Sequence, residues 1–546
     1  MSRNGRFYSL LILSVILTWP AVSYADASKP GIMQQINTLE QLLHYVNRNY
    51  YRETDAVDLY HGAIEGYLSK LDPHSTYIPP EDLQDTEERL QGSFEGIGIF
   101  FDIVDDFLTV LSPIEGSPAY RAGLLPGDRI RKIDGYSAVG IKTNEVTERL
   151  KGPKGSRVDV SVERAGESEL LEFEIKRDRI EVPSVPYAFK LSSDVGYVKV
   201  NRFSGHTVNE LETQLVRLLN GGSEKLILDL RGNGGGYLEQ AVAVANLFVE
   251  KDRLLVYTQG RHPRSREDHN ASKDPLIPSD LPLLVLVNSF SASASEIVAG
   301  AIQDYDRGLV VGHTTFGKGL VQKQYPLKNG GAVLLTIARY FTPSSRPIQR
   351  PYTEDRKSYI RDAHDDYDPN ADPDSLVGRP VYYTQILKRK VFGSGGITPD
   401  IILNRDSLNS FQSGLLRNKH FLVFAKRQED SIVREDPTFQ PFLERYHPGR
   451  REISAFKKLL KELEFEYSEE DFKSNTEFIK KEIKREIAQI RWGARAEGQV
   501  RAAQDSQVQQ ALALFEQAQQ LLAQRAFHYN QGYHPGSSDS RYQQVR

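Results

Sequence analysis

The strongest constraint on the fold is a regular alternation of two kinds of segment between about residues 185 and 405. Short apolar runs such as "KLILDL" and "PLLVLV" have the length and the β-branched content of buried strands. The segments between them repeat their apolar residues at helical spacing, as in "TVNELETQLVRLLN" and "ASEIVAGAIQDY". This alternation predicts a layered α/β domain over residues 185–405.

The first 25 residues follow a different pattern. Arg3 and Arg6 precede an apolar run from Leu10 to Leu17, and Ser23-Tyr24-Ala25 is a small-x-small cleavage signal. The pattern predicts a secretory signal peptide (residues 1–25) and export of the chain. The apolar run is short for a membrane span. If it stayed uncleaved, it would instead anchor the chain at the inner membrane.

Composition excludes several functions. The 546 residues include no cysteine, which rules out disulfides, thiolate catalysis and cysteine-based zinc sites. The formal net charge is −4, and loss of Arg3 and Arg6 with the signal makes it more negative, so nucleic acid is not an expected partner. Neither H-E-x-x-H nor G-x-S-x-G occurs. The commonest zinc-protease and hydrolase-elbow signatures are therefore missing.

Helical patterns lie toward both ends of the chain. Apolar residues at helical spacing predict a small N-terminal helical domain over residues 30–92, which "DPHSTYIPPEDL" closes with turn residues. Charged helical patterns predict a C-terminal helical extension over residues 406–530. Residues 531–546 have the composition of a disordered tail.

A glutamine-rich helix is predicted from about residue 504 to 525. Its apolar residues form one stripe, made of Val508, Leu512, Phe515 and Leu522. The stripe is equally consistent with packing on its own domain and with a homo-oligomer that forms through the C-terminal helices.

Residues 93–180 have short β-rich runs, a short helix pattern at Ser117–Ala122 and a hairpin signal at Asp134-Gly135. This segment resembles a PDZ domain in the loop Gly96-Ile97-Gly98-Ile99, in "SPAYRAGLLPGDRI" and in the "IDG" that follows. In that family the loop amides hold a peptide's terminal carboxylate while the peptide adds to the sheet as a strand. The resemblance implies that Gly96, Ile97, Gly98 and Ile99 bind peptide C-termini.

A serine-rich turn, "VNSFSASASEI", joins a predicted strand to a predicted helix. A hydroxyl at this junction lies near free N–H groups and the positive end of the helix dipole, which favours a developing oxyanion. Ser293 is the candidate nucleophile, and chemistry alone leaves Ser291 and Ser295 open as alternatives. Ser293 and Glu296 also spell an S-x-x-E capping box, so a purely structural role for the serine is the competing interpretation.

Lys318 ends "GHTTFGK", which spells a phosphate-binding loop. Gly319 follows where such a loop needs Ser or Thr, and the next residues predict a strand, so nucleotide binding is disfavoured. Lysine can instead serve as a base if burial lowers its pKa from about 10.4 toward 7. Phe316 and Leu320 are neighbours, and no acid lies within ten residues on either side, so the local sequence permits this shift.

Two nearby features complete the candidate site. Gln322 lies four residues after Lys318, on the same face in a strand or a helix, and it can accept a hydrogen bond from the ammonium without adding charge. "DLRGNGGG", residues 229–236, follows a strand, and its glycines let backbone N–H groups approach a substrate closely.

Together, "SASASEI" with "GAIQD", "TFGKGLVQ" and "DLRGNGGG", after a PDZ-like segment, resemble the carboxy-terminal processing peptidases. These are tail-specific serine proteases with a Ser-Lys dyad, and the resemblance covers residues 35–405. It implies a multidomain α/β + β protein whose PDZ domain is inserted before a layered, crotonase/ClpP-like protease core. It implies that Ser293 is the nucleophile, that Lys318 is the general base and that Gln322 orients the lysine. The backbone amides of Ala294 and Gly235 would form the oxyanion hole.

Two positions depart from the family pattern. Many members have Gly where this chain has Phe290, which bears on substrate access. Many have Pro where it has Gly234, which leaves the oxyanion glycine open among Gly234, Gly235 and Gly236.

The resemblance implies a periplasmic serine endopeptidase that captures the exposed C-terminus of a protein or peptide substrate and cleaves through an acyl-enzyme. Such a Ser-Lys peptidase requires no metal and no cofactor. It also implies control by the PDZ domain, and an adaptor protein as a further partner. The alternative is a PDZ-containing peptide-binding adaptor without proteolytic activity, in which Ser293 only caps a helix.

Overall fold

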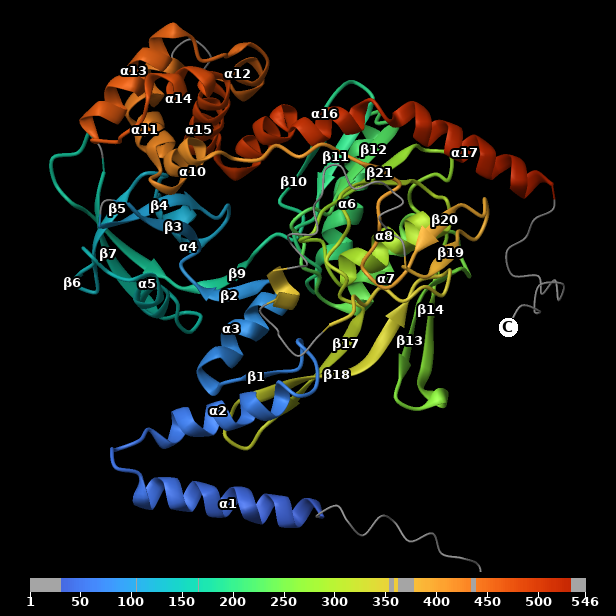
Figure 1. Ribbon diagram of the computed structural model, residues 1–546. Coiled ribbons are helices and arrows are strands. Elements are labelled where there is room, and N and C mark those ends of the chain that lie inside the picture. The colour runs from blue at the N-terminus through green and yellow to red at the C-terminus, as the bar shows by residue number, and fades with distance from the viewer. Residues whose placement is uncertain are drawn as a thin grey trace, which may run out of the picture. The chain divides into compact units, whose positions relative to one another are not determined.

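The computed structural model describes residues 31–104, 106–164, 166–352, 358–361, 378–433 and 438–531 (Figure 1). The predicted signal peptide, and the predicted tail apart from Gln531, lie outside these ranges. The chain divides into two compact units, Met1–Gly66 and Tyr67–Arg546. Within the described ranges, no helix combines the length and the apolarity that crossing a membrane requires.

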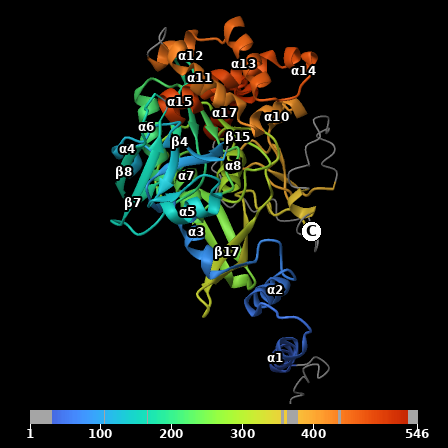
Figure 2. The same cartoon turned by 90° about the vertical axis from the view of Figure 1, so that its left-hand side faces the viewer.

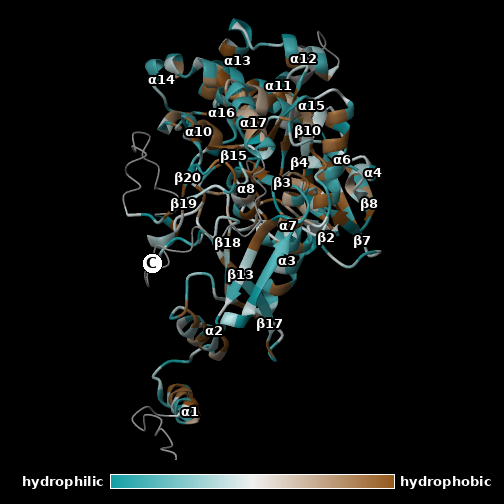
Figure 3. Cartoon of the chain, turned by 90° about the vertical axis from the view of Figure 1, so that its right-hand side faces the viewer, coloured by the Kyte–Doolittle hydropathy of each residue, from teal (hydrophilic) through white to brown (hydrophobic). Residues whose placement is uncertain are grey.

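The first unit consists of α1 (Ile32–Asn49) and most of α2 (Ala56–Leu68). Both helices contain hydrophobic as well as hydrophilic residues, as Figure 3 shows. The helices expected here are present, but the predicted domain boundary at residue 92 differs from the structure. Strand β1 (Thr76–Ile78) pairs with β18 of the second unit, and α3 (Pro80–Gln91) also belongs there. A three-residue strand is too short to show a period in the sequence, so its pairing was not predictable.

A six-stranded sheet forms the centre of the predicted α/β domain. Its order is β10-β11-β12-β15-β16-β21, and every neighbouring pair except β10 with β11 is parallel. The strands are Tyr187–Lys190, Val195–Lys199, Lys225–Asp229, Leu283–Val287, Leu309–Gly312 and Ile401–Ile402. Parallel neighbours need crossover connections, and α6 (Thr207–Asn220), α7 (Leu238–Asn246) and α8 (Ala294–Asp304) supply them.

Helices cover both faces of this sheet, which explains the nearly continuous apolar strands. Leu228 and Val285 pack with α6, α7 and α8 in one buried cluster, while Ile227 and Leu284 face a second cluster. The second cluster contains α16 (Ser506–Leu512) and α17 (Phe515–Asn530), which run along the sheet in Figure 1. The glutamine-rich segment is therefore two helices whose apolar stripe packs on the chain's own core.

A second sheet contains β13 (Leu254–Gly260), β14 (Arg266–Asn270), β17 (Leu320–Pro326) and β18 (Ala332–Phe341) together with β1. Strand β18 pairs with β1, β13 and β17. The polar stretch after β13 includes β14, which forms a hairpin with β13. A small hairpin of β19 (Val381–Tyr383) and β20 (Lys390–Phe392) follows.

The predicted PDZ domain has its own core and sheet. The sheet order is β3-β4-β5-β7-β8, with β6 beside β5, and β3 is an edge strand. The predicted helix is present as α4 (Pro118–Ala122), and the predicted turn at Asp134-Gly135 joins β5 to β6. The elements are β3 Ile99–Val104, β4 Phe107–Pro113, β5 Arg129–Ile133, β6 Tyr136–Ser137, α5 Thr143–Leu150, β7 Arg157–Glu163 and β8 Leu171–Lys176. Strands β2 (Ser93–Gly96) and β9 (Asp178–Glu181) pair where the chain enters and leaves.

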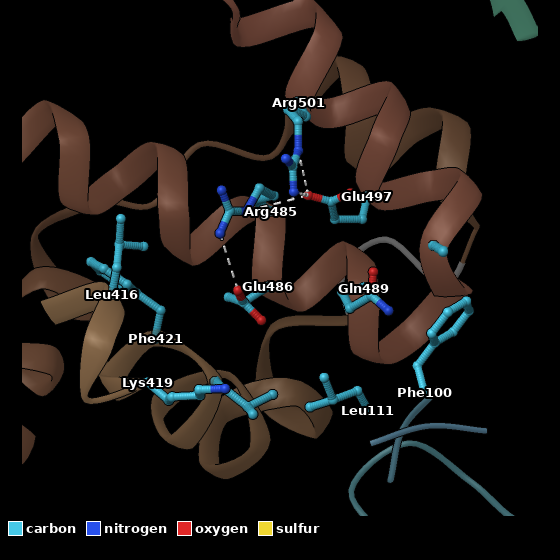
Figure 4. A pocket seen from close by; sticks show the side chains of 12 residues that line it. Phe100, Leu111, Leu416, Lys419, Phe421, Arg485, Glu486, Gln489, Glu497 and Arg501 are labelled. Carbon is cyan, nitrogen blue, oxygen red and sulfur yellow. Dashed lines mark hydrogen bonds and ion pairs between the residues drawn. The ribbon is translucent and has the colours of Figure 1, made fainter. Parts of the chain in front are cut away.

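The remaining helices form a cluster with its own core, and Figure 2 shows α11–α15 grouped together. They are α10 Ser410–Arg417, α11 His420–Val433, α12 Phe439–Arg445, α13 Arg450–Glu462, α14 Glu469–Ser474 and α15 Thr476–Gln504. Val104 and Leu111 of the PDZ sheet pack into this core. Figure 4 shows a pocket at the junction, with Phe100 and Leu111 on one side and Arg485, Glu486 and Glu497 of α15 on another. The predicted extension thus divides into a helical cluster and a layer on the α/β core.

Candidate active site

Three loops follow adjacent parallel strands and meet at one edge of the central sheet. They lead from β12 into the glycine turn at 232–236, from β15 into the serine turn at 288–293, and from β16 to Lys318. The carboxyl ends of parallel strands are the usual location of ligand sites in open α/β sheets. The topology therefore brings together the three motifs that the sequence analysis selected.

Ser293 immediately precedes α8, in a strained backbone conformation with φ 55° and ψ −110°. Such a conformation is unfavourable for a residue with a side chain, and it is typical of functional turns. Ser291 and Ser295 are fully buried, and their hydroxyls donate to the carbonyls of Leu230 and Asn233, each at 2.8 Å. Ser293 is partly exposed. Of the three serines, its hydroxyl is the one that a substrate can approach.

The capping interaction at this turn involves mainly the backbone of Ser293. The Glu296 carboxylate accepts from the Ser293 N–H at 2.7 Å, and the Glu296 N–H donates to the Ser293 carbonyl at 2.9 Å. The Glu296 half of the predicted capping box is therefore present. It fixes the turn through the main chain, which does not require the serine hydroxyl.

Glu296 also holds the loop that carries Lys318. Its carboxylate accepts from the Thr315 hydroxyl at 2.5 Å, from the Gly317 N–H at 2.8 Å and from the Lys318 N–H at 2.9 Å. The Glu296 side chain is fully buried, and burial raises its pKa. The hydrogen bonds that the carboxylate accepts act in the opposite direction and lower the pKa. One carboxylate thus ties the serine turn to the lysine loop.

The Lys318 side chain is largely buried, and burial lowers its pKa, while the charges of Glu296 and Asp72 act in the opposite direction. Among the described residues, none forms a hydrogen bond or ion pair with its ammonium group. The Tyr340 hydroxyl donates to its main-chain carbonyl and also interacts with Ser293. This environment favours the neutral amine, in the direction that the sequence analysis expected.

Lys318 lines a cavity of about 310 Å³. The other walls are mostly apolar and include Gly234, Phe290, Ala292, Phe316 and Tyr359. Phe290, which departs from the family pattern, is 48% exposed. The cavity can take an apolar side chain next to the lysine amine.

The structure does not bring Gln322 to the Lys318 ammonium in the way the sequence analysis expected. Lys318 lies in irregular backbone before β17, whereas Gln322 lies within the strand. Sides alternate only along regular strand backbone, so the spacing of four does not set a common face here. The Gln322 amide donates instead to the His74 carbonyl at 2.5 Å.

The phosphate-loop interpretation of "GHTTFGKG" fails on backbone geometry. The N–H groups of Thr315, Phe316, Gly317, Lys318 and Gly319 all donate to protein acceptors. A phosphate loop needs these groups directed at the ligand, and a helix after the lysine, whereas β17 follows here. Within the described ranges, no group of three or more His, Asp or Glu side chains is arranged to hold a metal ion.

The glycine turn packs directly against the nucleophile turn. Gly235 has φ 103°, and a Cβ there would lie 2.8 Å from the Ser293 Cβ, so no side chain fits. Its N–H, however, donates to the Asn233 side chain at 2.9 Å. The expected oxyanion donor is therefore already occupied in this structure. The Ala294 N–H lies in the first turn of α8, where N–H groups have no intrahelical acceptor.

Residues that the sequence analysis took for a simple turn also belong to the site. His74 lines the cavity, and its ring contacts Phe316 and bonds with the Tyr359 hydroxyl at 3.0 Å. Asp72 accepts from Ser75 and Thr336, and hydrogen bonds to the carboxylate lower its pKa although burial acts to raise it. The D-x-x-S pattern in "DPHS" indicates a turn that the aspartate side chain caps. The pattern does not show which distant residues this turn contacts.

The predicted carboxylate loop lies between β2 and β3. The Ile97 carbonyl accepts from the Ala119 N–H at 2.8 Å, and the Gly98 carbonyl accepts from the Ser117 hydroxyl at 2.9 Å. In a planar trans peptide the N–H points opposite to the carbonyl, so the Gly98 and Ile99 N–H groups point away from α4. This geometry, beside an edge strand, suits the capture of a terminal carboxylate.

Comparison with known proteins supports both the peptidase and the PDZ resemblance. Residues 194–357 match the model of peptidase family S41, and residues 109–164 match that of the PDZ domain. The carboxy-terminal-processing protease of Bartonella bacilliformis is 36% identical over 347 residues, which are 63% of this chain and 79% of that protein. The carboxy-terminal processing protease CtpA of Bacillus subtilis is 36% identical over 359 residues, 64% of this chain and 76% of that protein.

Solved structures of similar proteins include a photosystem II D1 C-terminal processing protease. It is 27% identical, with a TM-score of 0.33, over 60% of this chain and 91% of that one. The PDZ domain of a carboxy-terminal protease from Vibrio cholerae, in complex with a peptide, is 34% identical, with a TM-score of 0.16, over 16% of this chain and 99% of that one.

Proposed function

Because this chain belongs to the carboxy-terminal-processing proteases of peptidase family S41 and contains a PDZ domain, we propose that Ser293 and Lys318 form its catalytic dyad. The observation that carries the proposal is the state of Lys318. Its amine is largely buried, has a lowered pKa and lies on a loop that Glu296 ties to the Ser293 turn. A lysine in this state can accept a proton, whereas a solvated lysine cannot do so near neutral pH.

The chemistry follows from these two side chains. The Ser293 hydroxyl attacks the peptide carbonyl while Lys318 takes its proton, and the tetrahedral intermediate collapses as Lys318 returns that proton to the leaving amine. Water, deprotonated in the same way, then hydrolyses the acyl-enzyme. The Ala294 N–H, at the positive end of the α8 dipole, supports the developing oxyanion. The Gly235 N–H can join it only by releasing Asn233.

The cavity and the PDZ loop support a substrate class. An apolar side chain of the substrate would occupy the cavity beside Ala292 and Phe316. The terminal carboxylate would bind the Gly98 and Ile99 N–H groups while the tail adds to the free edge of β3. The substrate is therefore a protein or peptide with an exposed, apolar C-terminus. The pattern of residues 1–25 supports a periplasmic location.

The test is degradation of an unfolded protein with an apolar C-terminal tail, with the products identified by mass spectrometry. Wild type should cleave it, while Ser293→Ala and Lys318→Met should not, with unchanged circular dichroism. A C-terminal carboxamide on the same substrate is the matched control for the PDZ loop, because it removes the carboxylate and leaves the protein intact. Cleavage by either variant would contradict the dyad. Tail binding without cleavage by wild type would favour the non-proteolytic adaptor.

A further inference from the structure

The C-terminal extension contacts both loops that carry the proposed catalytic groups. Asp505 and Gln507, at the start of α16, bind Arg231, which directly precedes the glycine turn. The Arg231 Nη1 lies 3.0 Å from the Asp505 carboxylate and donates to the Gln507 Oε1 at 2.9 Å. The Gln507 Nε2 lies 3.0 Å from the Nε2 of His313, which opens the loop to Lys318. Two side chains of one helix terminus thus connect two loops of the site.

Arg231 is held from both sides within a balanced group of charges. Asp229 binds it at 2.6 Å, and Lys199 lies 3.2 Å from the same Asp229 carboxylate and also donates to the Arg231 carbonyl. The Arg231 side chain is 14% exposed. Its pKa is raised by Asp229 and Asp505 although burial acts to lower it, so it stays charged. Two carboxylates therefore compensate two buried cations, and loss of the Asp505 charge would leave the group unbalanced.

The hydrogen bonds from Arg231 to His313 have one consistent direction. Since the Gln507 oxygen accepts from Arg231, its amide nitrogen is the donor toward His313. Burial lowers the pKa of His313 to about 4, with the charges of Arg405 and Arg231 acting in the same direction, so its ring is neutral at neutral pH and can accept. These two hydrogen bonds fix the orientation of the Gln507 amide, which couples the position of the Arg231 loop to that of the His313 loop.

We propose that Asp505 and Gln507 are positioning residues of the peptidase: they hold the glycine turn and the lysine loop in the arrangement that catalysis needs. This inference rests on the proposed Ser293–Lys318 dyad. It assigns to the C-terminal extension a role in the reaction itself, because α16 starts at these two residues and α15 leads directly into them. Neither residue lines the cavity beside Lys318, so both would act through Arg231 and His313.

Asp505→Asn is the sharpest variant. Asn is as good an N-cap as Asp, so the variant keeps the acceptor for the Gln507 and Val508 N–H groups and removes only the charge. Gln507→Leu removes both hydrogen bonds and leaves the Asp505 cap in place, which keeps the test open if Asp505→Asn folds poorly. For both variants kcat should fall roughly 10-fold or more, with KM for a tailed peptide within about twofold of wild type. Asp505→Glu should recover much of the lost kcat.

The control is a contact that attaches the same C-terminal extension to the core at a distance from the candidate active site. Arg525 on α17 donates to the Tyr305 carbonyl at 3.0 Å and binds Glu250. Arg525→Leu should lower the Tm and leave kcat unchanged. Unchanged kcat in Asp505→Asn and Gln507→Leu, or an equal loss of kcat in Arg525→Leu, would overturn the proposal. If Ser293→Ala stayed active the dyad itself would fail, whereas an inactive Ser293→Ala beside a fully active Asp505→Asn would remove only the positioning role.

Discussion

The main-chain N–H groups of Ser293 and Lys318 donate to the same carboxylate oxygen, the Oε2 of Glu296, at 2.7 and 2.9 Å. The two residues are 25 positions apart in the sequence, on loops that follow adjacent strands. A shared acceptor inside the fully buried environment of Glu296 sets the distance between the two backbones. Proton transfer needs close contact between the serine and lysine side chains. The proposed dyad therefore depends on Glu296, which accepts from both backbones.

Replacement of Glu296 should therefore disturb catalysis more than folding. In Glu296→Gln, one carboxylate oxygen becomes an amide NH2 group, which faces N–H groups that donated to the carboxylate. Each buried donor left without an acceptor costs about 1–3 kcal/mol. We expect kcat to fall roughly 100-fold and the Tm to fall by several degrees. Thr315→Val, which removes one hydrogen bond to the same carboxylate and the acceptor of the Ile397 N–H, is the comparison variant: it should lower the Tm as well but lose less kcat. Equal kcat in wild type and Glu296→Gln would contradict this role.

The pH dependence of cleavage should report the Lys318 amine. Burial lowers its pKa from the ordinary value of 10.5, so kcat/KM should rise with pH through the lowered pKa and level off below pH 10.5. Lys318→Arg, whose guanidinium stays charged, should lose activity by roughly 1,000-fold and show no such rise. A profile for wild type that still climbs steeply at pH 10.5 would indicate an ordinary solvated lysine instead.

The same buried amine should cost stability at neutral pH. A lysine with a lowered pKa in the folded chain binds fewer protons there than in the unfolded chain, so stability rises with pH between the folded value and 10.5. Lys318→Met should consequently raise the Tm at pH 7 by roughly a few degrees, and this difference should shrink toward pH 10.5. Thermal unfolding of both proteins across this range is the measurement, and a constant Tm difference would refute the assignment.

The glycine turn allows a matched pair of substitutions. Gly235→Ala adds a Cβ 2.8 Å from the Ser293 Cβ and 2.9 Å from the Ala292 carbonyl, at φ 103°. Gly232 also has a positive φ, 72°, but a Cβ there would meet nothing within 4 Å. Both variants carry backbone strain of about 1–3 kcal/mol, but only Gly235→Ala displaces the nucleophile. We expect kcat to fall roughly 100-fold in Gly235→Ala and to stay near wild type in Gly232→Ala. Similar kcat values for the two would show that the turn does not control Ser293.

Phe290 should limit the size of the residue that enters the cavity. Its ring lines the cavity and is 48% exposed, so Phe290→Gly opens one wall without removing a buried core residue. For peptides with a large apolar residue at the cleavage site, kcat/KM should rise by about 10-fold, a gain typical of relieving one steric contact. Peptides with alanine at that position should change little. A uniform change for both peptides would assign Phe290 a role other than size selection.

Local sequence determined much of this protein. The alternation of apolar and amphipathic segments identified the layered α/β core, and turn chemistry located the PDZ hairpin at Asp134-Gly135 and the serine at the start of α8. The motifs identified the family, which the similarity to known carboxy-terminal-processing proteases confirms. These features are readable because strand and helix periods, caps and turns depend on residues only a few positions apart.

Tertiary structure decided what lies around the candidate dyad. The Gln322 amide donates to the His74 carbonyl, and the Asn233 side chain accepts from the Gly235 N–H. Contacts from His74, far upstream, and from Asp505, far downstream, complete the surroundings. Such contacts join residues separated by up to 285 positions. No local period records them, because chain folding alone selects which distant side chain fills a given cavity or balances a given buried charge.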